Sequence, residues 1–141
     1  MEIKDIMTQS VVSIHPNESV EVAARTMTQY NIGALPVCKD GKLCGMLTDR
    51  DIVTRCLAAN RHPGNTQVRQ VMTEQVTTVS PNMQTGAAAH LMGRLQIRRL
   101  PVVENGTLCG MVSLGDMAVR EETVLDAGDV LADVSSNISD R

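Results

Sequence analysis

The sequence contains an internal repeat, and this repeat limits the folds open to the chain more than any other feature. When the chain is shifted by 65 positions, residues 1–52 align with residues 66–117 without a gap, and 18 of the 52 positions are identical. Such a match indicates a duplicated unit. We therefore predict a first repeat with its linker at 1–65, a second repeat at 66–122 and an acidic C-terminal tail at 123–141.

The two repeats show the same order of predicted elements. A short extended segment ends at a proline, and a helix follows with apolar residues at helical spacing and, in the first repeat, Ser19 as a suitable N-cap. A hairpin comes next, because Asp40-Gly41 and Asn105-Gly106 stand between apolar runs and such pairs tolerate positive φ angles. A second helix follows each hairpin. The predicted extended segments are 11–14 and 76–79, the hairpin strands are 34–38, 43–47, 100–103 and 108–112, and the second helices are 49–59 and 114–120.

The order β-α-β-β-α, present twice, predicts the α+β fold class with a sandwich-like arrangement of helices and sheets. A repeat of about 65 residues buries little apolar surface by itself. We therefore expect the two repeats to pack their sheets together about a pseudo-twofold axis and to leave a cleft between them. Residues 60–66 are the predicted linker.

The composition argues against two classes of partner. The chain is 43% hydrophobic but has no Trp, no Phe and one Tyr, so it lacks the rings on which readers of single-stranded nucleic acid stack bases. No apolar run approaches the roughly 18 residues of a membrane span, and the start MEIKD lacks the apolar stretch of a signal peptide. We expect a cytoplasmic protein with no nucleic-acid and no membrane partner.

The charge is divided unevenly along the chain. The net charge is −3, with six acidic residues and one basic residue at 121–141, which leaves a mildly basic body. The tail also holds apolar residues at a weakly helical spacing, and two interpretations stay open: an amphipathic helix that docks on a partner subunit, or disorder.

Neither a metal site nor an active site is indicated. The four cysteines form no C-x-x-C pair, and none of the three histidines lies near a cysteine at metal-site spacing. We expect buried or half-buried thiols in a reducing compartment. No Ser or Cys has a plausible base near it within the repeat. We therefore predict no catalytic residue, no metal and no required cofactor.

A short motif recurs where the second hairpin strand meets the second helix. It reads Gly, two apolar residues, Thr or Ser, two variable residues and Asp, at residues 45–51 and again at 110–116. The glycine lets another group approach the strand, the hydroxyl is at a helix N-cap, and the Asp stands at the third helical position. A helix N-terminus offers unpaired N–H groups and a positive dipole potential that attract phosphate, and an Asp beside it can accept both hydroxyls of a ribose.

A structural role for the same motif also stays open. Thr48-x-x-Asp51 and Ser113-x-x-Asp116 resemble a capping box with Asp in place of the preferred Glu. Because the motif occurs at matched positions in both repeats, we favour ligand binding. Capping and ligand binding are compatible, since one hydroxyl can take part in either.

The repeated unit resembles a pair of cystathionine-β-synthase (CBS) domains, also called a Bateman module. The resemblance covers about residues 3–120. It rests on Met-Thr openings at 7–8 and 72–73, two Leu-Pro-Val strands, and the two motifs ending in Asp51 and Asp116. It implies a sensor of AMP, ADP, ATP, S-adenosylmethionine or a related ligand, with adenine in an apolar slot, ribose on the Asp and phosphate near the Thr or Ser. It also implies a homodimer, with four CBS units in a disc, in a small stand-alone bacterial protein.

The resemblance further implies two pockets, each drawn from both repeats. The residues of the first pocket are Thr48, Arg50 and Asp51, facing Ile97, Arg98, Arg99 and Thr77. Those of the second are Ser113 and Asp116, facing Ile32, Gly33, Ala34 and Val12.

The two implied pockets differ in charge. The Asp51 pocket would gather Arg50, Arg98 and Arg99, enough to clamp a phosphate through charge-assisted hydrogen bonds, whereas the Asp116 pocket is nearly uncharged. We hypothesise that phosphorylated adenosine prefers the Asp51 pocket. The alternative is that these arginines form a solvated strand edge.

The expected function is that of a regulatory module, not an enzyme. It would bind an adenosine nucleotide as regulatory ligand in the cleft between the two repeats and signal to an unknown target protein through the conformation of the dimer. The alternative is a protein-interaction or dimerisation scaffold with unoccupied pockets.

Overall fold

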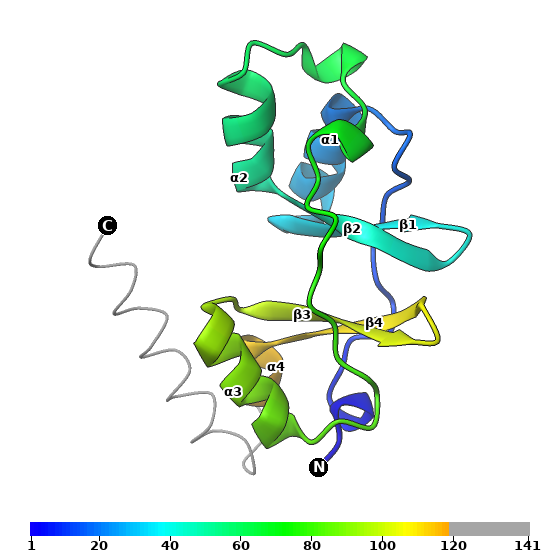
Figure 1. Cartoon of the computed structure of the whole chain (residues 1–141), viewed down its shortest axis with the longest axis vertical. Coiled ribbons are helices and arrows are strands. Elements are labelled where there is room, and N and C mark those ends of the chain that lie inside the picture. Colours follow the sequence, from blue (N-terminus) through cyan, green and yellow to red (C-terminus); the bar gives the residue numbers. More distant parts are fainter. Residues whose placement is uncertain (119–141) are drawn as a thin grey trace. The chain divides into compact units, whose positions relative to one another are not determined.

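Two compact units form the part of the chain that the structure, a computed structural model, describes, residues 1–118 (Figure 1). The first unit comprises residues 12–76, and the second comprises residues 1–11 together with the residues from 77 onward. Both units combine helices with an antiparallel hairpin, which confirms the predicted α+β class. The predicted acidic tail lies outside the described residues.

The first unit follows the predicted order of helix, hairpin and helix. Its first helix begins at the predicted cap, where the Ser19 hydroxyl accepts a hydrogen bond from the Val22 amide at 3.1 Å. Both helices lie on the same face of the hairpin (Figure 1). The elements are α1 (Val20–Tyr30), β1 (Ala34–Lys39), β2 (Lys42–Thr48), α2 (Asp49–Asp51), its π-helical continuation η2 (Ile52–Leu57), and the 3-10 turns η3 (Pro63–Asn65) and η4 (Val68–Gln70).

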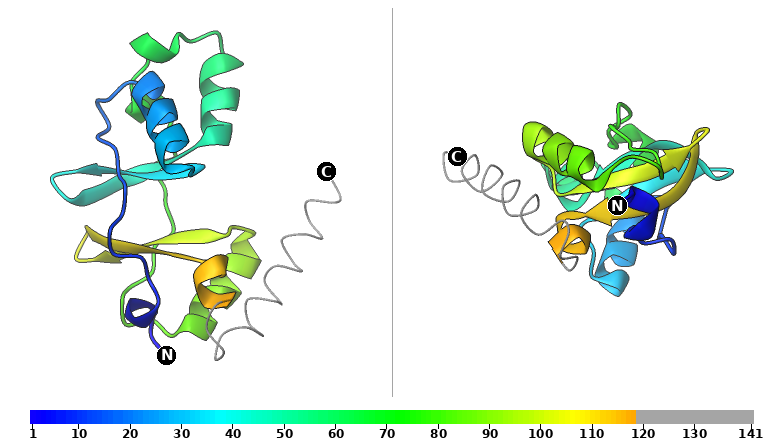
Figure 2. Two further views of the ribbon diagram at one scale, coloured as in Figure 1. Left: turned by 180° about the vertical axis from the view of Figure 1, so that it is seen from behind. Right: turned by 90° about the horizontal axis from the view of Figure 1, so that it is seen from below.

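The second unit repeats this order, and the start of the chain supplies its first turn. Figure 2 shows this N-terminal turn in the same unit as the second hairpin and its helices. The elements are η1 (Ile3–Asp5), α3 (Thr85–Leu95), β3 (Arg99–Glu104), β4 (Thr107–Ser113) and α4 (Leu114–Ala118). The last two residues of the predicted helix 114–120 lie outside the described residues.

The hairpin turns are as predicted. Asp40 and Gly41 have φ angles of 53° and 78°, and Asn105 and Gly106 have 53° and 80°. Two consecutive positive φ angles are typical of the type I′ turn, whose twist matches that of the flanking strands. Each hairpin also has one irregularity in its register, at equivalent positions of the two units.

The predicted extended segments are reduced to one bridge each. Ile14 pairs with Val37, and Val79 pairs with Val102, both in parallel. The cause is the proline of each Leu-Pro-Val strand. Pro36 accepts a hydrogen bond from the Ile14 amide at 3.0 Å but has no N–H to donate to the preceding residues of the segment, and Pro101 has the same effect.

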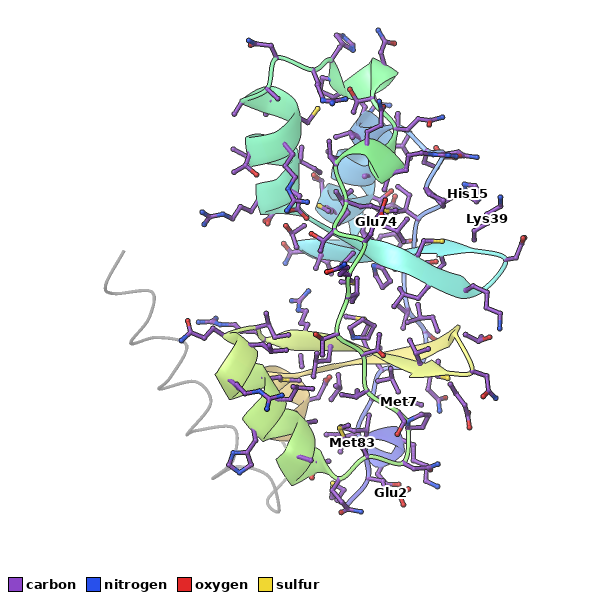
Figure 3. All side chains as sticks on the ribbon, in the orientation of Figure 1. Glu2, Met7, His15, Lys39, Glu74 and Met83 are labelled. Atoms are coloured by element: carbon purple, nitrogen blue, oxygen red, sulfur yellow. The ribbon has the colours of Figure 1, made fainter. Side chains whose placement is uncertain are left out.

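The opening segment of each sequence repeat packs in the unit that holds the hairpin of the other repeat. Ile3 and Ile6 are buried in the core of the second unit, whereas Val68 and Val71, their counterparts, are buried in the core of the first. Met7 and Met83, labelled in Figure 3, pack against the core of the second unit. The boundaries of the compact units therefore differ from the boundaries of the sequence repeats.

A glycine in each second strand makes this exchange possible. The Thr73 amide donates to the Met46 carbonyl at 2.9 Å, and the Met46 amide donates to the Thr73 carbonyl at 3.0 Å. A Cβ on Gly45 would lie 2.6 Å from that Thr73 carbonyl oxygen, and a Cβ on Gly110 would lie 2.7 Å from the Thr8 carbonyl oxygen. The group that approaches the motif glycine is thus the backbone of a Met-Thr opening.

The cores contain no aromatic ring. Met92 and Met117 are fully buried among aliphatic residues in the second unit, and Met27 is buried in the first. The flexible thioether side chain of Met fills the irregular space that rings fill elsewhere. Tyr30, the one aromatic residue, is 52% exposed. No helix within residues 1–118 is long and apolar enough to cross a membrane.

The glycine contact gives a stability prediction. Replacing Gly45 or Gly110 by Ala forces a Cβ against a backbone carbonyl, so we expect each variant to lose about 1–3 kcal/mol of unfolding free energy, as overpacking does. Urea unfolding followed by circular dichroism measures this loss.

Gly115→Ala is the matched control. A Cβ there would meet only the Ser113 hydroxyl at 3.5 Å, so the helix should become more stable, by up to about 1 kcal/mol. Equal stability of all three variants would contradict the proposed role of the close approach.

Candidate functional site

The first motif is built as a capping box. The Thr48 hydroxyl accepts a hydrogen bond from the Asp51 amide at 3.1 Å, and Asp51 Oδ2 accepts one from the Thr48 amide at 3.0 Å. Thr48 is the N-cap of α2 and Asp51 is its third residue, as predicted. The structural role of the motif is therefore present, with Asp in the position that Glu usually holds.

The second motif has the same geometry. The Ser113 hydroxyl accepts a hydrogen bond from the Asp116 amide at 3.2 Å, and Asp116 Oδ2 accepts one from the Ser113 amide at 2.8 Å. In both motifs the cap uses one carboxylate oxygen and leaves the other. Asp116 Oδ1 accepts no hydrogen bond from the described part of the chain. The cap therefore orients each Asp without consuming its capacity to accept a hydrogen bond.

Arg55 occupies the remaining oxygen in the first motif. Its Nε lies 3.8 Å from Asp51 Oδ1, and its Nη1 donates to the Val71 carbonyl at 3.1 Å and to the Thr73 hydroxyl at 3.2 Å. The Asp51 side chain is only 14% exposed, so this weak ion pair is partly shielded from water. Arg55 thus connects the motif to the Met-Thr segment that packs on the same strand.

Internal hydrogen bonds use the backbone amides at the start of α2. The Asp49 amide donates to the Gly33 carbonyl at 2.9 Å, the Arg50 amide to Asp49 Oδ1 at 2.8 Å, and the Asp51 amide to Thr48. Our sequence-based expectation that this helix N-terminus offers unpaired amides to a phosphate is wrong for the first motif. The reason is local, because Asp49 and the Gly33 loop supply acceptors that the spacing of the motif does not reveal.

Each unit holds about half of the predicted pocket residues, and its hairpin pairs residues that the resemblance assigned to different pockets. Ala34 pairs with Thr48 at the end of the first hairpin, and Arg99 pairs with Ser113 at the end of the second. The Arg98 carbonyl accepts a hydrogen bond from the Leu114 amide at 3.0 Å, the counterpart of the Gly33 contact. In the first unit are Val12, Ile32, Gly33, Ala34, Thr48, Arg50 and Asp51, and in the second are Thr77, Ile97, Arg98, Arg99, Ser113 and Asp116. The facing of residues from different units in one pocket stays a prediction.

Comparison with known proteins identifies the family. The family model described as "CBS domain" matches twice, at residues 3–58 and 68–121. The chain belongs to the CBS domain family. The two matches follow the sequence repeats and confirm that the chain is a tandem CBS pair.

Several relatives are small CBS proteins. The chain is 44% identical over 133 residues to the CBS domain-containing protein YhcV of Bacillus subtilis, and the match covers 94% of each. Among solved structures, it is 35% identical to Hypoxic Response Protein I with two coordinated zinc ions, covering 84% of this chain and 97% of that one, with a TM-score of 0.77. It is 29% identical to the CBS domain pair of MJ0100 in complex with 5′-methylthioadenosine and S-adenosyl-L-methionine, with 84% and 93% covered and a TM-score of 0.74.

Residues 1–118 contain no cluster of three His, Cys, Asp or Glu side chains that would hold a metal ion. The zinc ions belong to the relative, and the prediction that this CBS pair needs no metal stays a prediction.

One titratable group, the Cys38 thiol, has a shifted pKa. Burial raises the pKa of the Cys38 thiol, and the neighbouring Cys44 raises it further, against a hydrogen bond from Ser13 that lowers it.

Arg55 is not among the site residues predicted from the sequence. Two signals point to it: it stands four residues after Asp51, where a helix brings side chains together, and it repeats as Arg120 in the second CBS domain. Arg120 lies outside the described residues. The three arginines predicted to bind phosphate, Arg50, Arg98 and Arg99, are exposed, and their side chains form no hydrogen bond or ion pair within residues 1–118.

The capping box predicts a stability cost for the loss of its hydroxyl. Thr48→Ala leaves the Asp51 amide without its acceptor, so we expect a loss of about 0.5–2 kcal/mol in the free energy of unfolding, and the same for Ser113→Ala. Thr54→Ala is the matched control, because the Thr54 hydroxyl only bonds back to the Arg50 carbonyl at 2.9 Å. If urea titrations gave the control and the cap variants the same stability, the cap would carry no energetic weight.

Proposed function

We propose that this CBS pair is a regulatory module that binds an adenosine-containing nucleotide, such as AMP, ADP, ATP or an S-adenosylmethionine-like ligand, in the cleft between its two repeats. The observation that carries the proposal is the carboxylate of each motif. The cap fixes Oδ2 of Asp51 and of Asp116 and orients Oδ1. Oδ1 of Asp51 lies 3.8 Å from Arg55 Nε, a weak ion pair beside which a ribose hydroxyl can still donate to this oxygen. Such an oriented acceptor suits the ribose of a nucleoside.

In this proposal the phosphate group of the ligand is bound by arginine side chains and not by backbone amides. Because the first amides of α2 are already hydrogen-bonded, an anion there needs cations, and Arg50, Arg98 and Arg99 are exposed without partners within residues 1–118. Guanidinium groups bind phosphate with two parallel hydrogen bonds. We propose that these arginines meet in the Asp51 pocket and make it the site for phosphorylated adenosine.

A relative with a solved complex supports a nucleoside as the class of ligand. The MJ0100 pair binds two adenosine compounds, and it covers most of this chain. A base slot built from aliphatic side chains such as Ile32 and Ile97, both half-buried here, needs no aromatic ring. The absence of Trp and Phe is therefore compatible with a single bound nucleotide.

Calorimetric titration with AMP tests the assignment of the pockets. We expect Asp51→Ala to abolish the tight site and Asp116→Ala to leave it, because the arginines belong to the first pocket in our proposal. Arg98→Gln should weaken AMP binding about tenfold, the effect of one charge-assisted hydrogen bond, and should leave adenosine binding unchanged.

Arg94→Gln is the control for charge, since Arg94 is also an exposed arginine of the second unit but outside the predicted pockets. Equal losses of AMP affinity in both Asp variants, or none in either, would contradict the proposed preference.

An exposed apolar stripe favours a second role, as a dimerisation surface. Val53 and Leu57 are 55% and 54% exposed and stand four residues apart on η2. Side chains at this spacing share one face of a helix. We propose that this face contributes to a homodimer of four CBS units, whose conformation reports the ligand to a target protein. A scaffold with empty pockets remains the alternative function.

Analytical ultracentrifugation tests the dimer. We expect the unaltered chain to sediment as a dimer at micromolar concentration and the double variant Val53→Ser with Leu57→Ser to shift toward monomer. Thr54→Ser, on the neighbouring face, is the control. A double variant that stays fully dimeric would rule out this surface as the interface.

A further inference from the structure

Two of the four cysteines come together on the first hairpin. Pro36 of β1 pairs with Met46 of β2, so in a regular ladder Cys38, two residues after Pro36, would pair with Cys44, two residues before Met46. The register instead shifts between Val37 and Cys38. The shift makes Cys38 face Leu43, with Cys44 as the extra residue beside it.

The bulge keeps the two cysteines adjacent. Two residues of the bulged strand oppose one residue of the partner strand, so Cys44 and Leu43 both oppose Cys38. Opposing residues of antiparallel strands have Cα atoms about 4.5–5.5 Å apart, which is within the roughly 4.4–6.8 Å that a disulfide spans. Both thiols are free and half-buried.

The electrostatics of Cys38 agree with this placement. Its pKa is raised by burial and also by Cys44, which means that the second thiol lies close enough for the two charged forms to repel each other. The side chain of Cys44 packs at the edge of the core of the first unit. The pair is therefore a dithiol held in place by the sheet.

The second unit provides a natural comparison. Its hairpin has the same register shift, between Val102 and Val103, and it keeps Cys109 at the position of Cys44. Val103 replaces Cys38 there. The same fold thus presents a dithiol in one unit and a lone thiol in the other, so the backbone does not require the second cysteine.

We propose that Cys38 and Cys44 are a redox modification site that forms a reversible disulfide across the bulge with a low-molecular-weight disulfide as oxidant. One cysteine thiolate attacks a sulfur of the oxidant and releases one thiolate, which leaves a mixed disulfide. The thiolate of the other cysteine attacks the protein sulfur of this mixed disulfide and releases the second thiolate. Both displaced thiolates take up the cysteine protons, so two small thiols are formed for each protein disulfide.

The disulfide acts on the strand that carries the first motif. Cys44 directly precedes Gly45, on which the Thr73 backbone packs, and the same strand ends at Thr48. A covalent bond between β1 and β2 at this point fixes the bulge next to the glycine contact. The modification does not depend on the proposed nucleotide function, and its test uses no nucleotide.

Oxidised glutathione and tryptic mapping test the proposal on the full chain. At about pH 8.5, where a raised thiol pKa still leaves some thiolate, we expect the disulfide to remove the mass of two hydrogen atoms from the intact protein, while Cys109 gains one glutathione. Trypsin cuts after Lys39 and Lys42, so the two cysteines fall on separate peptides, 26–39 and 43–50. Figure 3 labels Lys39, next to Cys38. These peptides should migrate as one linked species and separate on reduction with dithiothreitol.

Cys38→Val is the matched variant, because it copies the second unit. It should form no linked peptides and should retain glutathione on Cys44, as the unaltered chain does on Cys109. The proposal is overturned if Cys38 and Cys44 both remain open to alkylation after this treatment. It is equally overturned if they link to Cys56, to Cys109 or to another chain instead of to each other.

Discussion

The close approach of two backbones at a glycine is the contact on which the rest of each unit depends. Where Gly45 lacks a side chain, the Thr73 segment forms two hydrogen bonds with Met46, and the equivalent bonds join Thr8 to Met111. This contact draws the opening segment of one sequence repeat into the unit of the other, where it completes the aliphatic core. The two repeats therefore depend on each other, since each repeat supplies a segment that completes the core of the other unit.

The same strands connect this contact to the helix starts, where the predicted site residues lie. Three residues after Gly45, Thr48 begins the helix and its hydroxyl fixes the Asp51 amide. The cap and ligand interpretations of the motif are compatible, because the cap uses Oδ2 of the carboxylate and orients Oδ1. Arg55 adds a link from this carboxylate back to the Met-Thr segment, so ligand binding at Asp51 would act directly on the packing that holds the unit together.

The features that could be predicted from the sequence are those that depend on a few adjacent residues. Helix caps and type I′ turns depend on a few adjacent residues, and the cap at Ser19 and both hairpins are as predicted. The exchange of opening segments joins residues that are far apart along the chain, Thr8 with Met111 and Thr73 with Met46, and no local pattern encodes it. The filled amides of α2 were missed because the Gly33 carbonyl and the Asp49 carboxylate supply acceptors that the spacing of the motif does not reveal, and the adjacent thiols were missed because a shift in strand register creates them.

Native mass spectrometry of the freshly purified full chain, with and without added AMP, ATP and S-adenosylmethionine, tests the central claim most directly. Nucleotide binding through the motif carboxylates predicts a retained or titratable adenosine ligand on the unaltered chain, and loss of that mass when both Asp51 and Asp116 are replaced by Ala. An unaltered chain that carries none of these ligands at millimolar concentration, or a double variant that binds them equally well, would contradict the account.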